Sequence, residues 1–185
     1  MENIEKAIND YTSAIEKDSK YLWGYVNRAK LYMQLGNYKD AIQDWSIAIN
    51  LEPDMASHYQ DRGYCLNEVG NYEDAIRDFK KAIEIKIESV EAHSGMGFAY
   101  CQLEMYEYAF KNYDNAIKYA IEQKYQNIEL GHIYHLRGLV HQNNTIDKDN
   151  FKKSIIDFDK SIELNPDEPT YYHARGFSYE QLDEK

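Results

Sequence analysis

YVNRAKLYMQLGNYKDAIQDWSIAINLEP, residues 25–53, is the stretch that decides the fold. Its apolar residues recur every three or four positions, which is typical of amphipathic helices. A Gly-Asn pair at Gly36 interrupts this spacing midway and Pro53 closes it, so the stretch predicts two short helices joined by a tight turn. The pattern returns at Tyr59, thirty-four residues after Tyr25, as YQDRGYCLNEVGNYEDAIRDFKKAIEI. A self-similar period of this length indicates a protein built from stacked repeats.

The recurring residues resemble the tetratricopeptide repeat. They are Tyr25, Arg28, Ala29 and Tyr32 in the first helix, Ala41, Trp45 and Ala48 in the second, and the closing Pro53. The resemblance implies an all-α fold, a right-handed superhelix of stacked helix-turn-helix units, with the first helices lining its concave face. It also implies a protein that binds other proteins.

Aligning the rest of the chain to this pattern predicts one domain of two half units and four full units. The half units are residues 3–17, with the second helix only, and 169–182, with the first helix only; the full units are 21–53, 54–87, 88–123 and 130–166. Small residues recur at fixed places, such as Ala29, Gly63 and Gly97, where we expect the two helices of a unit to approach closely.

The turns between the helices of a unit follow the same period. Gly36 and Gly70 are expected to end their helices in the left-handed conformation, and the asparagine after each is expected to cap the next helix. In the third full unit Glu104 and Met105 replace the Gly-Asn pair. A looser turn is therefore predicted there.

An arginine follows the first-helix aromatic by three residues in most units, and an aspartate precedes the second-helix aromatic. The third full unit loses both together, because Met96 and Asn112 replace them. This parallel loss predicts an ion pair within each unit, and it fits less well with pairing each aspartate to the next unit's arginine. The predicted pairs are Arg28 with Asp44, Arg62 with Asp78, and Arg137 with Asp157. Arg175 has no aspartate in its own unit and is expected to be unpaired; anion binding is the functional alternative for these arginines.

Composition narrows the class of partner. The chain has 185 residues, a formal net charge of -11, and 18 Tyr against 6 Phe and 2 Trp. Such an acidic chain is a poor match for nucleic acid or an anionic membrane surface. Cys65 and Cys101 do not form a disulfide framework, and the N-terminal MENIEKAINDY lacks the apolar core of a signal peptide. A cytoplasmic protein is the expectation.

The resemblance implies a peptide-binding groove along the first helices. Its predicted lining residues are Val26, Asn27, Lys30, Gln60, Asp61, Tyr64, Ser94, Phe98, Cys101, His135, Leu139, Gln142, His173 and Phe177. An aromatic stripe flanked by Asn, Gln and His side chains suits a peptide ligand. The alternative is that these side chains only pack against neighbouring first helices.

One specialised ligand is excluded. Tetratricopeptide domains that hold the C-terminal carboxylate of heat-shock chaperones use a cationic clamp of Lys, Asn and Arg on three first helices. The matching positions starting at the first full unit are Val26, Lys30, Asp61, Glu91 and Gly95. They make no such clamp, and Asp61 and Glu91 would repel a carboxylate.

No arrangement of residues indicates catalysis. His132, His135 and His173 could in principle share a metal ion, but their spacing is loose and solvated groove histidines are the favoured interpretation. The Ser, Cys and His residues show no nucleophile arrangement. We therefore expect a chain that is not an enzyme and needs no cofactor or metal.

The predicted function is a noncatalytic scaffold that binds a peptide segment of a partner protein in its concave groove. The alternative is a structural element that stacks end to end, as a homo-oligomer, through its terminal half units. That alternative depends on apolar residues expected to be uncovered at the two ends, which are Ile4, Ile8, Tyr11, Phe177, Tyr179 and Leu182.

Overall fold

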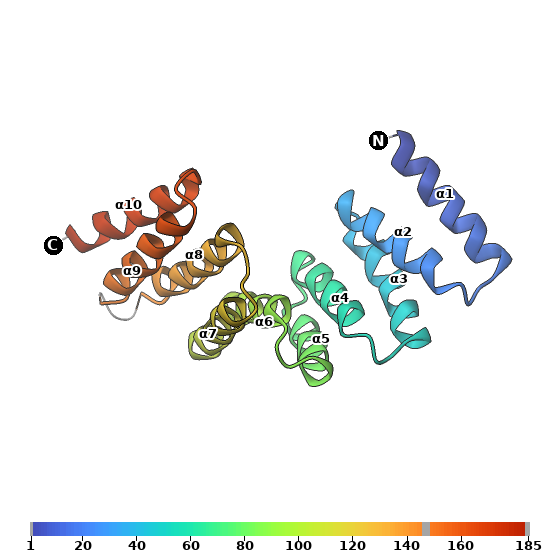
Figure 1. Cartoon of the computed structure of the whole chain (residues 1–185), viewed down its shortest axis with the longest axis horizontal. Coiled ribbons are helices and arrows are strands. Elements are labelled where there is room, and N and C mark those ends of the chain that lie inside the picture. Colours follow the sequence, from blue (N-terminus) through green and yellow to red (C-terminus); the bar gives the residue numbers. More distant parts are fainter. Residues whose placement is uncertain (1, 146–148, 184–185) are drawn as a thin grey trace. The chain divides into compact units, whose positions relative to one another are not determined.

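The computed structural model describes residues 2–145 and 149–183, and this part of the chain forms ten α-helices and no strand (Figure 1). The helices are α1 (Glu2–Lys17), α2 (Leu22–Gln34), α3 (Tyr38–Leu51), α4 (Ala56–Glu68), α5 (Tyr72–Ile85), α6 (Val90–Gln102), α7 (Tyr106–Glu122), α8 (Asn127–Asn143), α9 (Asp149–Leu164) and α10 (Pro169–Asp183). The predicted all-α helical-repeat class is confirmed. None of these helices is both long and apolar enough to cross a lipid bilayer.

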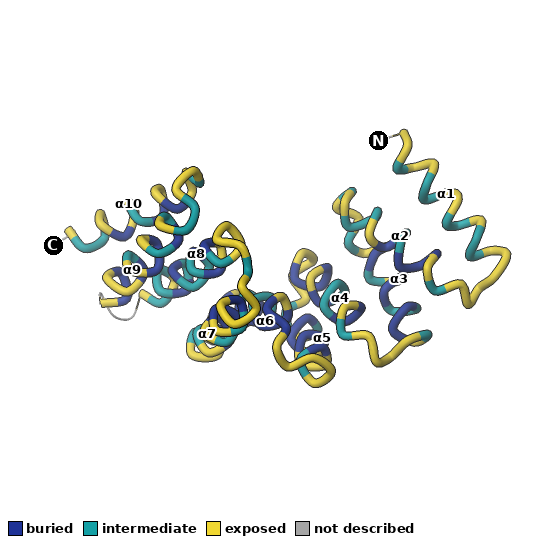
Figure 2. Tube along the Cα trace, in the orientation of Figure 1, coloured by how far each residue is buried: buried dark blue, intermediate teal, exposed yellow. Residues whose placement is uncertain are grey.

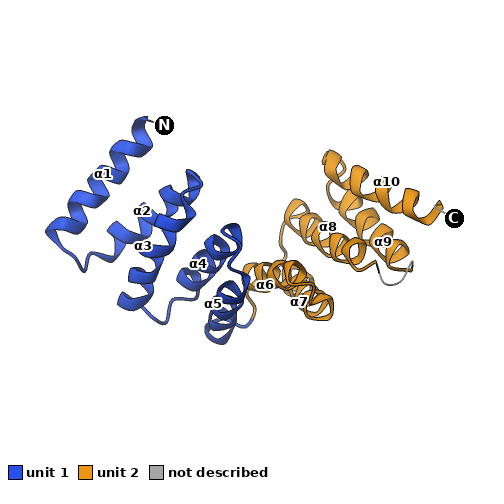
Figure 3. Ribbon diagram, turned by 180° about the vertical axis from the view of Figure 1, so that it is seen from behind, with its two compact units in different colours: residues 1–87 blue, residues 88–185 orange. Residues whose placement is uncertain are grey.

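The helices divide into two compact units, residues 1–87 and residues 88–185 (Figure 3). In unit 1, α2 packs against α3 and α4 against α5, while α1 contacts α2 and α3 contacts α4. In unit 2, α6 packs against α7 and α8 against α9, while α7 contacts α8 and α9 contacts α10. The buried residues lie mainly where paired helices face each other (Figure 2). The division of the chain into half and full repeats stays a prediction.

Small residues on the first helix of a pair make room for an aromatic ring on the second. Ala29 and Trp45 belong to one buried cluster in unit 1. A Cβ atom at Gly63 would lie 2.9 Å from the ring of Phe79, which is closer than side chains tolerate without rearrangement. The recurring small residues therefore set how closely the two helices of a pair can pack.

The tight turns share one backbone geometry, including the turn that was expected to be looser. Gly36 and Gly70 have φ angles of 74° and 78°, as predicted, and Glu104 takes the same left-handed region with φ 58°. The next N–H in that turn, from Met105, donates to the carbonyl oxygen of Tyr100 at 2.9 Å. The prediction of a looser turn was wrong, because the glutamate adopts the glycine conformation and keeps the same hydrogen bond.

The expected asparagine caps are also corrected. Asn37 and Asn71 stand at the N-cap positions of α3 and α5, but neither side chain makes a cap hydrogen bond. The Asn71 side chain instead donates to the Asp74 carboxylate at 2.7 Å. The two asparagines therefore do not cap α3 and α5 through their side chains.

The three predicted ion pairs within units are confirmed. Each is bidentate, with Nε and Nη2 of the arginine donating to the two oxygens of a buried aspartate. The pairs are Arg28 with Asp44, Arg62 with Asp78, and Arg137 with Asp157. Two parallel hydrogen bonds fix the angle between the helices as well as their separation.

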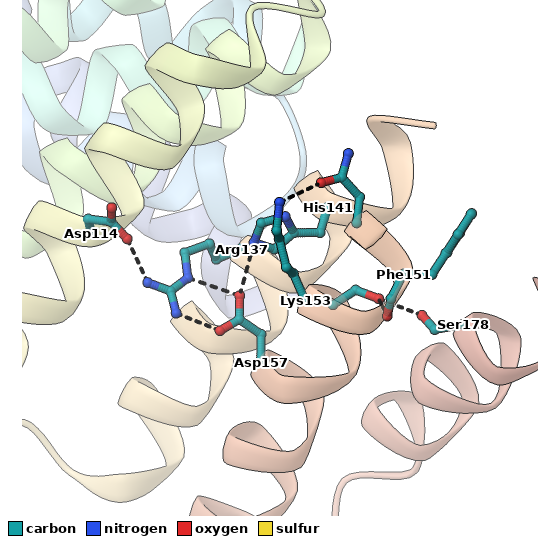
Figure 4. A network of polar contacts seen from close by, with 9 residues as sticks. Asp114, Arg137, His141, Phe151, Lys153, Asp157 and Ser178 are labelled. Carbon is teal, nitrogen blue, oxygen red and sulfur yellow. Dashed lines mark hydrogen bonds and ion pairs between the residues drawn. The ribbon is translucent and has the colours of Figure 1, made fainter. Parts of the chain in front are cut away.

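Each arginine also uses Nη1 to reach the preceding second helix. The acceptors directly follow that helix's aromatic residue, and they are Thr12 for Arg28 (2.9 Å), Ser46 for Arg62 (3.1 Å), Asp114 for Arg137 (2.6 Å) and Asp159 for Arg175 (2.6 Å). We call this series of contacts the arginine ladder. Figure 4 shows one step of it, with Arg137 between the two carboxylates.

Two details of the arginine ladder were not predicted. Arg175, expected to be unpaired, binds Asp159 on the preceding helix, so that expectation was wrong. In the sequence, the acceptor position ahead of Met96 is held by Lys80, a cation that cannot accept a hydrogen bond. The missing arginine therefore coincides with a missing acceptor.

Candidate functional site

Unit 2 contains a cavity of about 490 Å³ at the C-terminal ends of α6 and α8. Its walls come from the last turns of these two helices, the turn between α6 and α7, the start of α9 and the second half of α10. The described lining residues are Cys101, Gln102, Glu104, Tyr106, Gln142, Asn143, Thr145, Phe151, Phe177 and Gln181. The wall is therefore rich in side-chain amides and aromatic rings.

Three of the predicted groove residues meet at this cavity. Cys101, Gln142 and Phe177 lie on α6, α8 and α10, so three first helices each contribute one predicted residue. The sequence prediction missed the other lining residues, because it followed a few register positions and ignored the turns. One available signal was Glu104, the glutamate that replaces the turn glycine.

Hydrogen bonds across α8, α9 and α10 hold one wall of the cavity in place. The side-chain nitrogen of Gln142 donates to the carbonyl oxygen of Ala174 at 2.7 Å and to the hydroxyl of Ser178 at 2.6 Å. That hydroxyl lies 2.7 Å from the hydroxyl of Ser154 on α9. The nitrogen of Gln142 thus ties α8 to α10 and sets the position of Phe177, one turn from Ala174 along α10.

The cavity wall is neutral apart from one carboxylate. Burial raises the pKa of the Cys101 thiol, which accepts a hydrogen bond from the Asn143 amide at 3.6 Å and stays uncharged. Burial and the nearby charge of Glu104 both raise the pKa of Tyr106. Among the described lining residues, Glu104 is the one acidic residue, and none of the others is basic. The formal charge of the described cavity lining is therefore negative.

The remaining predicted residues of unit 2 lie outside this lining. Ser94, Phe98 and Leu139 are half-buried, and His173 is exposed. His135 is buried, with its ring centroid 4.8 Å from that of Tyr171 and 5.5 Å from that of Phe158. Burial, together with His132, lowers the pKa of His135 to about 4, so the ring is neutral and serves packing. Within residues 2–145 and 149–183, no group of three metal-binding side chains could hold an ion.

In unit 1 the predicted residues divide between surface and core. Tyr64 exposes 44% of its surface, and its ring meets that of Tyr38 edge-on with a centroid distance of 6.1 Å. Lys30 is exposed, whereas Asn27 and Gln60 are half-buried. Val26 is a correction: it is buried in the cluster of Ala29 and Trp45, and so it offers no surface to a ligand.

Asp61 is the strongly perturbed carboxyl group of unit 1. Burial raises its pKa to about 6, even though the positive charge of Lys30 acts in the opposite direction. Since Asp61 and Lys30 lie within electrostatic reach, two predicted groove residues come together here. A pKa of about 6 is well above the ordinary range of an aspartate.

Two family models match parts of the chain. A model described as "TPR repeat" matches residues 63–104, and one described as "Tetratricopeptide repeat" matches residues 23–55. No curated protein sequence matches the chain. One matched segment runs from α2 to the turn after α3, and the other runs from the second half of α4 to the turn after α6.

Solved structures share the fold at low sequence identity. The crystal structure of MamA has a TM-score of 0.74 and 20% identity over 88% of this chain and 89% of that chain. YrrB, described as a TPR protein with an unusual peptide-binding site, has a TM-score of 0.73 and 19% identity over 95% of this chain and 84% of that chain. The APC/C hetero-tetramer Cut9-Hcn1 has a TM-score of 0.80 and 13% identity over 98% of this chain and 34% of that chain.

Proposed function

The chain belongs to the tetratricopeptide repeat family, and from this premise we propose that it is a noncatalytic scaffold that binds a peptide segment of a partner protein. Members of the family are in general interaction modules. YrrB, which shares the fold, is described as having a peptide-binding site.

The proposal depends mainly on the cavity in unit 2. A side-chain amide offers both a donor and an acceptor, which match the carbonyl and N–H of an extended peptide backbone. Gln102, Asn143 and Gln181 supply such amides around the cavity. Phe177, with 45% of its surface exposed, supplies an apolar anchor of the kind that dominates binding energy at interfaces.

The other exposed or half-buried residues of the predicted groove complete the proposed surface, unit by unit. In unit 1 they are Asn27, Lys30, Gln60, Asp61 and Tyr64; in unit 2 they are Ser94, Phe98, Leu139 and His173. The peptide-binding role of each of these residues is part of the proposal.

The chemistry of the described residues supports a noncatalytic role. Burial raises the pKa of the Cys65 thiol to about 12 and also raises that of Cys101, so neither sulfur is an activated nucleophile. The formal charge of -11 disfavours nucleic acid and anionic membranes as partners. We propose a protein partner and a cytoplasmic setting.

A peptide selection tests the proposal. The full chain is used to select binders from a random peptide display library, and the affinity of the best binder is measured by calorimetry. Phe177→Ala is expected to weaken binding by at least about fivefold, the loss that defines an important interface residue. Tyr179→Ala is the matched control, because Tyr179 lies on the same helix with 50% exposure but does not line the cavity. Equal affinities for wild type and Phe177→Ala, with the helical content unchanged, contradict the proposal.

A second candidate function is self-assembly through the outer helices. The observation that favours it is that α1 has no fully buried residue among those described, while α10 exposes Tyr172, Phe177 and Tyr179. Apolar faces of this kind can stack head to tail between copies. Sedimentation velocity over a range of concentrations separates the two candidates. Growth of mass with concentration favours assembly, whereas a constant monomer mass leaves peptide binding as the function.

A further inference from the structure

Glu104 holds a backbone conformation that glycine would adopt more easily. Its φ angle is 58°, and the equivalent turns of unit 1 place Gly36 and Gly70 in the same region. A residue other than glycine is strained in this conformation, because its Cβ atom crowds the backbone. Local strain of this kind is concentrated at functional sites. The side chain that accepts this strain is the one charged group in the described lining of the cavity. The combination suggests that the carboxylate is needed where it is.

The surroundings of this carboxylate suit a cation. The lining includes the aromatic residues Tyr106 and Phe177, and aromatic ring faces attract cations. Gln102 and Gln181 contribute amide oxygens that can accept hydrogen bonds from an ammonium or guanidinium group. A carboxylate makes charge-assisted hydrogen bonds with the same groups. The lining therefore offers three kinds of contact to a positively charged side chain.

We propose that the cavity of unit 2 receives a basic side chain, lysine or arginine, of the bound peptide, and that Glu104 pairs with its charge. The inference rests on the proposed peptide-binding function and specifies its ligand class. The formal charge of -11 supports it, because an acidic protein attracts basic segments and repels acidic ones. An acidic side chain in the cavity would instead place two negative charges together.

The test uses the peptides selected from the display library by the full chain. Each is synthesised in a second form in which one arginine is replaced by citrulline, which keeps nearly the same shape but has no charge. For wild type, the arginine form is expected to bind about tenfold more tightly than the citrulline form. For Glu104→Gln, this ratio is expected to fall to about one to two. Glu107→Gln is the control, since Glu107 is an exposed residue of α7 outside the cavity lining, and it should keep the wild-type ratio.

The possible outcomes separate this inference from the function on which it rests. Selected peptides that share a basic residue, with a preference lost only in Glu104→Gln, support it. Peptides that bind through the cavity but carry neutral or acidic residues overturn it and leave the peptide-binding function standing. An unchanged arginine-to-citrulline ratio in Glu104→Gln also overturns it. A selection that yields no binder overturns both. Circular dichroism of each variant shows whether the helices are intact.

Discussion

Glu104 and Asp61 are two carboxyl groups whose positions destabilise the folded protein, each for a different reason. Glu104 has a backbone in the left-handed region, with φ 58°. Asp61 is half-buried, and this burial raises its pKa to about 6. Both residues lie at sites proposed to contact a ligand. Residues that reduce stability without a structural benefit are expected where function requires them.

Replacing Glu104 by glycine is expected to stabilise the protein by about 1 kcal/mol, because glycine adopts positive φ without strain. Urea unfolding of wild type and Glu104→Gly measures the difference. The matched control is Gly70→Ala, where an added Cβ meets no atom within 4 Å, so only the backbone effect remains. It is expected to lower stability by a similar amount. A less stable Glu104→Gly would show that the glutamate side chain contributes to folding.

Asp61→Asn is expected to raise stability at about pH 8 and to have little effect at about pH 4. The native carboxyl group has a raised pKa, so between the unfolded and folded pKa values the native state binds more protons than the unfolded state. Stability therefore falls as pH rises through this window, and the ionised aspartate lowers it by roughly 1–2 kcal/mol once its partial exposure is allowed for. Urea unfolding of both proteins at the two pH values checks this. A difference that is the same at both values would rule out ionisation as its cause.

In the arginine ladder, Arg28, Arg62 and Arg137 each join their own helix pair to the preceding helix, so that one guanidinium serves two neighbouring elements. Arg137 binds Asp157 on its paired helix α9 and Asp114 on α7 (Figure 4). The Asp157 side chain is 3% exposed, whereas that of Asp114 is 60% exposed. The two contacts of one arginine therefore differ in strength, because burial decides what an ion pair contributes.

Arg137→Met is expected to destabilise the protein by about 3–5 kcal/mol, because it leaves the buried Asp157 carboxylate without its partner. Arg175→Met is the matched control. Its partner Asp159 is 53% exposed, so removing that pair is expected to cost about 0–1 kcal/mol. Chemical denaturation of both variants gives the comparison. Similar losses in the two variants would mean that the burial of the aspartate does not set the strength of the contact.

The sequence predicted those features of the elements that recur at a fixed spacing. The helix pairs, the close approach at Gly63 and the ion pair of Arg62 with Asp78 all followed from the period of the repeat, whereas the bidentate geometry of that pair did not. The ladder's second contact did not, because its acceptors are of three residue types, Thr, Ser and Asp, and no common letter marks them. The cavity was predicted only in part, since its turn and helix-end residues lie outside the regular register.

At the scale of the whole molecule, the two units carry different titrating groups. In unit 2, burial lowers the pKa of His135 and of His141 to about 4. In unit 1, burial lowers the pKa of His58, while that of Asp61 is raised. A buried neutral histidine opposes protonation, so unit 2 loses stability as pH falls below the unfolded histidine pKa of about 6.5. In unit 1 the effects of Asp61 and His58 on the pH dependence of stability have opposite signs.

Acidification is therefore expected to destabilise unit 2 more than unit 1. Both tryptophans, Trp23 and Trp45, belong to unit 1, so their fluorescence reports on that unit, whereas far-UV circular dichroism reports on all helices. Between about pH 7.5 and about pH 5, the thermal midpoint by circular dichroism should fall more than the midpoint by fluorescence. Midpoints that fall together would indicate that the two units unfold as one cooperative block.

The arginine ladder also dictates the order in which repeats can follow one another. Each guanidinium takes its second acceptor from the preceding helix. A repeat is therefore best matched to a predecessor whose second helix has a hydroxyl or a carboxylate directly after its aromatic residue. A rearranged gene that placed the Arg28 repeat directly behind Lys80 would bring two cations into the same joint. Shuffled or duplicated versions of this chain should therefore be less stable where that neighbour rule is broken.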